Sequence, residues 1–128
     1  MSLRRSIDIE SFRHSNPIPG ACRIGPMIAS SVIIGRDPSS TTVPDAVASQ
    51  IVNLFSHMGE LLREAGAGWE HVIKIDFAVP SLDDRAAINV PFLEHFPDPG
   101  SRPARHTSAG VSVAQCTFWA YVPEPANG

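Results

Sequence analysis

The sequence predicts an α/β protein of the α+β kind, in which a mixed β-sheet carries two helices packed on one face. Two observations lead to this class. One long segment and one shorter segment space their apolar residues as an amphipathic helix does, whereas the other apolar segments alternate or form short runs typical of strands. The order is strands, helix, strand, helix, strands, and both helices on one face of the sheet is the simplest layering of these elements.

Length and composition fit one domain. The chain has 128 residues, of which 43% are hydrophobic and 18% charged, and a chain of this size folds without needing a disulfide or a metal. We expect a single domain over 1–128, with an N-terminal extension at 1–16 and a frayed tail at 123–128. Loose apolar alternation in the extension predicts a short edge strand and a loop, which Pro17 and Pro19 close.

Two strands are expected next. Residues 22–24 and 27–34 predict a strand pair around a Gly25-Pro26 turn. The second strand is apolar along most of its length, which suits a strand covered on both faces or lying at a subunit contact.

The longest periodic segment predicts the first helix, with Thr42 as its N-cap, Pro44 in its first turn and Gly66 as its C-cap. Its apolar residues lie one, three or four positions apart and therefore form one stripe on the helix surface. The stripe consists of Val47, Ile51, Leu54, Phe55, Met58, Leu61, Leu62 and Ala65.

The second helix follows a strand. Residues 72–79 alternate and are rich in β-branched side chains, which predicts a strand that Pro80 ends. Ser81 and Asp84 have the spacing of a capping box, which marks the start of a helix. Because Pro91 has no backbone N–H to donate, we expect a kink or break in this helix near Val90.

The last two strands are predicted over 105–113 and 115–122, with a tight turn or bulge at Ala114-Gln115. The sheet face turned away from the helices would then be largely apolar and uncovered. We expect sister subunits to bury it.

Charge and composition exclude several functions. The net charge is −3, with 10 Lys and Arg against 13 Asp and Glu, and the basic residues are scattered; a nucleic-acid partner is not expected, because such proteins cluster their basic residues. No apolar run is long enough to span a membrane, and no signal peptide opens the chain, so we expect a cytoplasmic protein without a membrane partner. Cys22 and Cys116 lack the spacing of a metal or redox site, and we expect no metal and no cofactor.

Several motifs in the same order resemble the Rid (reactive intermediate deaminase) family, also called the L-PSP endoribonuclease or translation-initiation inhibitor family. The resemblance covers roughly 17–122. It is carried by Ala87-Ile88-Asn89-Val90-Pro91-Phe92-Leu93-Glu94-His95-Phe96, by Arg102-Pro103-Ala104-Arg105, by Glu64-Ala65-Gly66 before Val72-Ile73-Lys74-Ile75, and by Ile24-Gly25 before Ser30-Ser31.

This resemblance implies a chorismate-mutase-like fold, a homotrimer and a cleft between each pair of subunits. Arg105 matches the arginine that holds a substrate carboxylate, and the planar guanidinium fork suits that task because it can donate two parallel hydrogen bonds. Asn89 and Ser31 match residues near the cleft. Thr107 stands at a position often held by a cysteine, and Ile18 stands where many members have a tyrosine.

The chain also departs from the family pattern. Val32-Ile33 replaces the family's Gly-Gln, and the acidic residue of the last strand has no counterpart, since Trp119 or Ala120 falls at about that position. His106 is next to Arg105, but neighbouring residues of a strand point to opposite faces, so we expect His106 to face away.

Three functions are weighed. The favoured hypothesis is hydrolysis of a reactive enamine or imine to a keto acid and ammonia, with Arg105 as the catalytic residue that anchors the carboxylate. The alternative is a non-catalytic trimer that binds a small carboxylate-bearing metabolite. Ribonuclease activity or translation inhibition is disfavoured, because none of the five histidines pairs with a basic cluster.

Overall fold

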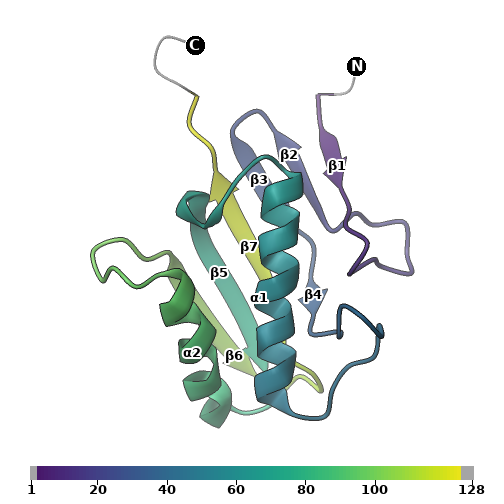
Figure 1. The fold of residues 1–128 in the computed structure, drawn as a ribbon, viewed down its shortest axis with the longest axis vertical. Coiled ribbons are helices and arrows are strands. Elements are labelled where there is room, and N and C mark those ends of the chain that lie inside the picture. Colours follow the sequence, from purple (N-terminus) through teal and green to yellow (C-terminus); the bar gives the residue numbers. More distant parts are fainter. Residues whose placement is uncertain (1–2, 125–128) are drawn as a thin grey trace.

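The computed structural model describes residues 3–124. Its helices are α1 (Val47–Glu64) and α2 (Arg85–His95), with short 3-10 turns η1 (Trp69–His71) and η2 (Leu82–Asp84). The strands are β1 (Arg5–Ile7), β2 (Ala21–Ile24), β3 (Met27–Ser30), β4 (Ile33–Ile34), β5 (Val72–Val79), β6 (Ala104–Ala109) and β7 (Gln115–Tyr121). Figure 1 shows both helices lying against the same face of the sheet.

All strands belong to one seven-stranded sheet, in the order β1-β2-β3-β7-β5-β6. β4 pairs with β7 beyond the end of β3. β5 and β6 are parallel, and the other pairs are antiparallel. The predicted α+β class, a mixed sheet with two helices on one face, is confirmed.

The two faces of the sheet differ in their surroundings. Alternate residues of β5, Ile75, Phe77 and Val79, are buried under the helices. On β7, Phe118 is 1% exposed whereas Trp119, on the opposite face, is 48% exposed. Most of the core therefore lies between the sheet and the two helices, and the other face is open in the single chain. The predicted stripe of α1 forms the helical side of this core.

The start of α1 differs from the prediction. The helix begins at Val47 rather than after Thr42, and no side chain caps it. The residue before a proline is sterically disfavoured in the helical region, so Pro44 keeps the preceding residue extended. The Pro44 carbonyl instead accepts a hydrogen bond from Gln50 Nε2 (2.8 Å). The predicted end holds: Gly66 follows the helix with a φ of 82°, a conformation that glycine adopts without strain.

The capping box of Ser81 and Asp84 is confirmed. Ser81 N donates to Asp84 Oδ2 (3.1 Å), and the Ser81 hydroxyl accepts from the backbone of Asp83 (3.2 Å). The box opens η2, which leads directly into α2. The break expected near Val90 is not found, because α2 runs through Pro91 without interruption. Proline removes one helical hydrogen bond, and burial of the neighbouring Phe92 offsets that loss.

Two predicted strands are shorter than expected. The strand over 27–34 divides into β3 and β4, because the Ser30 hydroxyl accepts the hydrogen bond of Phe118 N (2.8 Å) that a strand carbonyl would otherwise take. The strand predicted over 105–113 stops at Ala109. Gly110, with a φ of 104°, turns the chain there, and no tight turn at Ala114-Gln115 is needed.

The N-terminal segment is part of the sheet. β1 pairs with β2, as the predicted edge strand requires, and Ile7 and Phe12 are buried. Of the tail expected to fray, 125–128 lies outside the described residues. Among the described helices, none is both long and apolar enough to cross a membrane.

Candidate functional site

Arg105 lies at the edge of the sheet, beneath α2. Within residues 3–124, its strand, β6, pairs only with β5, and Arg105 is opposite Ile75, a residue that the helices bury. Paired residues share a face, so the Arg105 side chain is on the helix-covered side. There its guanidinium carbon lies 4.9 Å from the centre of the Phe92 ring. The aromatic face is attractive to a cation and gives the guanidinium a fixed floor.

The guanidinium of Arg105 is half-buried but has no counter-ion in the described part of the chain. Among residues 3–124, the Arg105 side chain makes no hydrogen bond. The ion pair found in that range joins Lys74 to Asp76 (3.4 Å) and does not involve Arg105. Burial lowers the pKa of Arg105, and the positive charge of Arg85 lowers it further. An arginine stays protonated at neutral pH despite such a shift. Arg105 thus presents an unneutralised charge that a carboxylate can bind.

Two further predicted site residues lie along the same edge. Thr107 is two residues beyond Arg105, opposite the buried Phe77, and therefore projects from the same face. Asn89 is exposed on α2, one helical turn before Phe92. Arg105 and Thr107 thus project from the same face of β6, and Asn89 lies on α2, the helix that carries Phe92.

Ile18 and Ser31 lie elsewhere. The Ser31 hydroxyl donates to the Pro19 carbonyl (2.7 Å), and its backbone N–H donates to the Gly20 carbonyl (3.0 Å), so Ser31 ties the loop that carries Ile18 to the end of β3. Ile18 is 45% exposed. This region is separated from β6 by β7 and β5, a distance of about 14 Å across the sheet. One chain alone does not bring the five predicted residues together.

The open face of the sheet carries the residues that alternate with the Arg105 side. His106 is opposite Asp76 and projects from this face, so the prediction that it faces away from Arg105 is confirmed. A hollow of about 190 Å³ there is lined by His106, Asp76, Thr117 and others. Trp119 also lies on this face, which means that within one chain it does not fill space beside Arg105.

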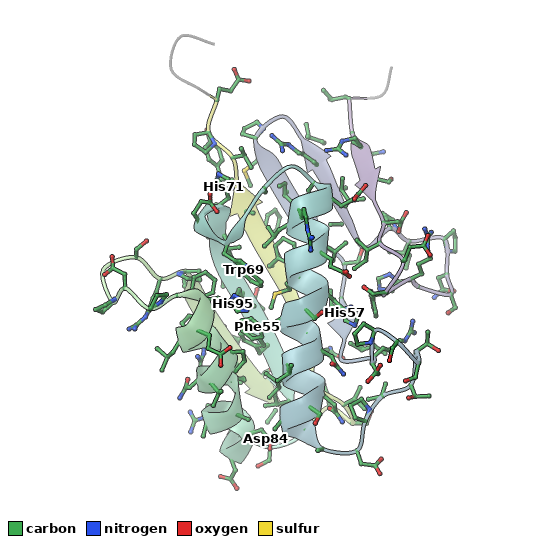
Figure 2. All side chains as sticks on the ribbon, viewed as in Figure 1. Phe55, His57, Trp69, His71, Asp84 and His95 are labelled. Atoms are coloured by element: carbon green, nitrogen blue, oxygen red, sulfur yellow. The ribbon has the colours of Figure 1, made fainter. Side chains whose placement is uncertain are left out.

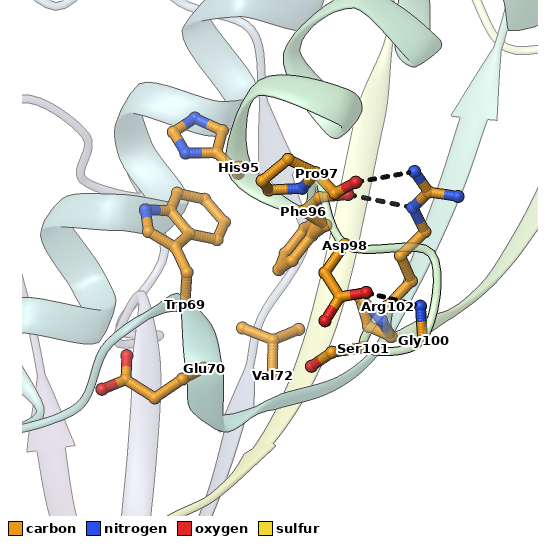
Figure 3. A pocket seen from close by; sticks show the side chains of 11 residues that line it. Trp69, Glu70, Val72, His95, Phe96, Pro97, Asp98, Gly100, Ser101 and Arg102 are labelled. Carbon is orange, nitrogen blue, oxygen red and sulfur yellow. Dashed lines mark hydrogen bonds between the residues drawn. The ribbon is translucent and has the colours of Figure 1, made fainter.

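A second hollow, of about 350 Å³, lies between η1 and the loop that precedes β6 (Figure 3). Its arginine, Arg102, differs from Arg105. Arg102 Nε donates to the Phe96 carbonyl (2.9 Å) and Nη2 to the Pro97 carbonyl (3.3 Å). Because these bonds hold the loop, Arg102 fits a structural role, and Arg105 is the better candidate for a ligand.

An aromatic stack holds the two helices together beside this hollow. The His95 ring is 4.2 Å from Trp69 and 5.4 Å from Phe55, centre to centre, and Figure 2 shows the three side chains gathered between α1 and α2. Burial lowers the pKa of His95, which favours the neutral ring within the stack. Trp69 is thus a packing residue.

Arg85 was missed by the sequence reasoning. It is the first residue of α2, and its charge is close enough to influence Arg105. The available signal was its spacing, because Arg85 precedes Asn89 by four positions and both therefore lie on one face of the helix. No group of three potential metal ligands is found within residues 3–124.

The comparisons with known proteins decide the family. The model of the family described as endoribonuclease L-PSP matches residues 10–118. The chain belongs to this family. The resemblance seen in the motifs of the Rid family is therefore confirmed, and the chain is a divergent member.

Named relatives are moderately similar. The mouse 2-iminobutanoate/2-iminopropanoate deaminase is 30% identical over 90 residues, 70% of this chain and 65% of its own length. A RutC family protein of Synechocystis is 34% identical over 74 residues, 56% of either chain. The chloroplastic Reactive Intermediate Deaminase A of Arabidopsis thaliana is 28% identical over 71% of this chain and 48% of its own length. The matched part of the chain thus spans between about half and two thirds of the length of these relatives.

Solved structures share the fold. RidA from an Antarctic Psychrobacter superimposes with a TM-score of 0.82 at 20% identity, over 92% of this chain and 99% of that one. The YjgF gene product of E. coli gives 0.80 at 22% identity, over 91% and 98%. The α+β architecture of this family is therefore the architecture of the chain.

Proposed function

We propose that this chain hydrolyses reactive imines, or the enamines that tautomerise to them, and that Arg105 holds the substrate carboxylate. The observation that carries the proposal is the guanidinium of Arg105, which is half-buried, lies over Phe92 and lacks a counter-ion among the described residues. Family membership supports the reaction class, because a relative of 30% identity is named as an imine deaminase.

The reaction needs little chemistry from the protein. Water adds to the carbon of the C=N bond, the C–N bond then breaks, and nitrogen leaves as ammonia while the carbon becomes a ketone. Such imines already react with water slowly, so positioning and modest electrostatic stabilisation suffice. In this proposal Arg105 fixes the carboxylate, and Asn89 and Thr107 line the same side of the cleft.

We also propose that the active unit is a homotrimer with its sites between subunits. Ile18 and Ser31 lie across the sheet from Arg105, so a site containing all of them needs residues from two copies. The open sheet face supports this assembly, because Trp119 (48% exposed) and Tyr121 (44%) lie on it without cover. Light scattering should then give three times the mass of the chain.

A cytoplasmic location is part of the proposal. Cys22 and Cys116 are both free thiols, as is usual in a reducing compartment. Relatives include a mitochondrial and a chloroplastic protein, so fluorescence microscopy of the tagged chain in its host is the test.

The experiment generates 2-iminopropanoate in situ from alanine with an amino-acid oxidase and traps surviving imine with semicarbazide. Wild type, Arg105→Ala and Arg105→Lys are compared after light scattering has verified equal assembly. Arg63→Ala, which removes an exposed arginine from the end of α1, is the matched control. Wild type and the control should suppress trapping, whereas Arg105→Ala should lose about a hundredfold in kcat/KM, as expected for a charged hydrogen-bonded pair.

A non-catalytic binding protein is the second candidate. The last strand, β7, contains no carboxylate in its sequence from Gln115 to Tyr121, so a side chain that could activate water there is missing. If wild type leaves semicarbazide trapping unchanged while calorimetry detects binding of propionate that Arg105→Ala abolishes, this second function replaces the first.

A further inference from the structure

Three residues of α2 form a stripe beside Arg105. Arg85, Asn89 and Phe92 are separated by four and three positions, the spacing that places side chains on one face of a helix. Phe92, at one end of the stripe, lies against the guanidinium of Arg105 (4.9 Å). The face of α2 that borders the proposed carboxylate site therefore carries a second arginine at its other end.

The Arg85 side chain is held in place at its base and free at its tip. Its Nε donates to the Leu82 carbonyl (3.0 Å), in the turn that precedes α2. Its two terminal nitrogens make no hydrogen bond or ion pair within residues 3–124. Arg85 thus offers two terminal NH2 groups and a positive charge that the described part of the chain does not use.

The two arginines influence each other electrostatically. After burial, the charge of Arg85 is the second cause that lowers the pKa of Arg105. Like charges disfavour each other, and no carboxylate is within 4 Å of either guanidinium among the described residues. An anionic ligand that contacts both guanidinium groups would offset this repulsion.

We propose that Arg85 is a second anion-binding residue of the Arg105 site, and that the site takes ligands with two carboxylates. This inference rests on the proposed function. It names the preferred substrates as imines of dicarboxylic α-amino acids, the compounds formed when an acidic amino acid is oxidised at its α-carbon. Arg105 holds the α-carboxylate, Arg85 holds the side-chain carboxylate, and water converts the C=N group between them into a ketone with release of ammonia.

The placement of the arginines favours two carboxylates over one larger anion. Arg105 projects from β6, whereas Arg85 begins α2, with Asn89 between Arg85 and Phe92 on the helix. A ligand that engages both guanidinium groups therefore needs two anionic ends joined by a short chain. An uncharged substrate tail would leave Arg85 without a partner.

The test compares a diacid with a monoacid. 2-Iminoglutarate and 2-iminopropanoate are generated from glutamate and alanine by an amino-acid oxidase, and the ratio of their kcat/KM values is measured for wild type, Arg85→Gln and Arg85→Lys. The matched control is Arg63→Gln, which removes the same charge from an exposed position at the end of α1.

We expect wild type to prefer the diacid, and Arg85→Gln to lower the diacid-to-monoacid ratio about tenfold. Arg85→Lys should retain part of the preference, and Arg63→Gln should leave the ratio unchanged. High salt should reduce the ratio in wild type. If wild type hydrolyses 2-iminopropanoate but Arg85→Gln leaves the ratio unaltered, the proposal is overturned while the proposed function survives.

A binding experiment separates the two proposals further. Succinate and propionate differ in their second carboxylate, and calorimetry gives their Kd values without any turnover. If wild type hydrolyses neither imine, the proposed function fails. In that case the second anion site is supported if wild type binds succinate more tightly than propionate and Arg85→Gln abolishes this preference. It is refuted if the ratio of the propionate Kd to the succinate Kd is the same in both proteins.

Discussion

Replacing the aromatic floor under Arg105 tests how the site is held. Phe92 is 6% exposed and Phe96 is 5% exposed, and both lie at the C-terminal end of α2. Phe92→Leu and Phe96→Leu therefore remove similar buried area, but Arg105 lies over the ring of Phe92. The pair of variants separates the loss of packing from the loss of the cation–π contact.

The expected sizes follow from these contacts. Each substitution removes part of a buried ring and should lower the free energy of unfolding by about 1–2 kcal/mol. The urea midpoint should then fall by roughly 0.5–1 M in both variants. A cation–π contact to a half-buried guanidinium contributes about 1 kcal/mol. Phe92→Leu alone should therefore raise KM for 2-iminopropanoate by about fivefold.

The assays are urea unfolding followed by tryptophan fluorescence, and steady-state kinetics with semicarbazide trapping. Similar midpoints with a KM increase only in Phe92→Leu would support the assignment. Equal KM values in the two variants would show that the ring of Phe92 does not hold the guanidinium in place. A larger KM in Phe96→Leu would point instead to the hollow bordered by Phe96 (Figure 3).

Other predictions concern stability and reactivity. Gln50→Leu leaves the buried N–H of Ala114, now bonded to Gln50 Oε1 (2.8 Å), without a partner; it should cost about 2–3 kcal/mol and lower the Tm by roughly 10 °C in calorimetry. Burial lowers the pKa of His57, so its contribution to stability is present above its ordinary pKa and is lost as the pH falls through the folded-state pKa. In His57→Gln the urea midpoint should thus fall less between about pH 7.5 and about pH 5 than it does in wild type. The fall that remains in the variant is expected from His95, whose pKa burial also lowers. Burial raises the pKa of the Cys116 thiol, and mass spectrometry after iodoacetamide treatment should find it unmodified until the protein unfolds.

Short sequence motifs predicted the start of a helix correctly where the motif's own side chains satisfy the backbone groups there. Ser81 and Asp84 form a reciprocal box that satisfies backbone groups on its own, so its position could be inferred from sequence. Thr42 has the same polar character, yet α1 starts later. The difference is Pro44, which holds the chain extended and offers its carbonyl to Gln50. The later start of α1 could not be predicted, because it depends on where the Gln50 side chain packs in the folded structure.

Long-range pairing limited the prediction of the site. Alternation along a strand placed Arg105 and Thr107 on one face and His106 on the other, and the register agrees. Alternation cannot tell how many strands separate two segments. Ser31 and Arg105 looked compatible with a common site, but β7, a strand from the end of the sequence, inserts between β3 and β5. That insertion places the two residues apart within one chain.

The placement of Arg85 relative to Arg105 also depends on long-range topology that the sequence does not show. The two residues are separated by 20 positions in the sequence, and no local pattern relates a helix start to a strand that comes after a loop. They lie on the same side of the sheet because β6 is parallel to β5, which returns the chain beneath α2. The parallel crossover thus brings the two positive charges to one side of the molecule. Because the charge of Arg85 lowers the pKa of Arg105 and neither guanidinium has a carboxylate within 4 Å among residues 3–124, an anion that contacts both would relieve their repulsion. That is the physical reason to look for the second carboxylate.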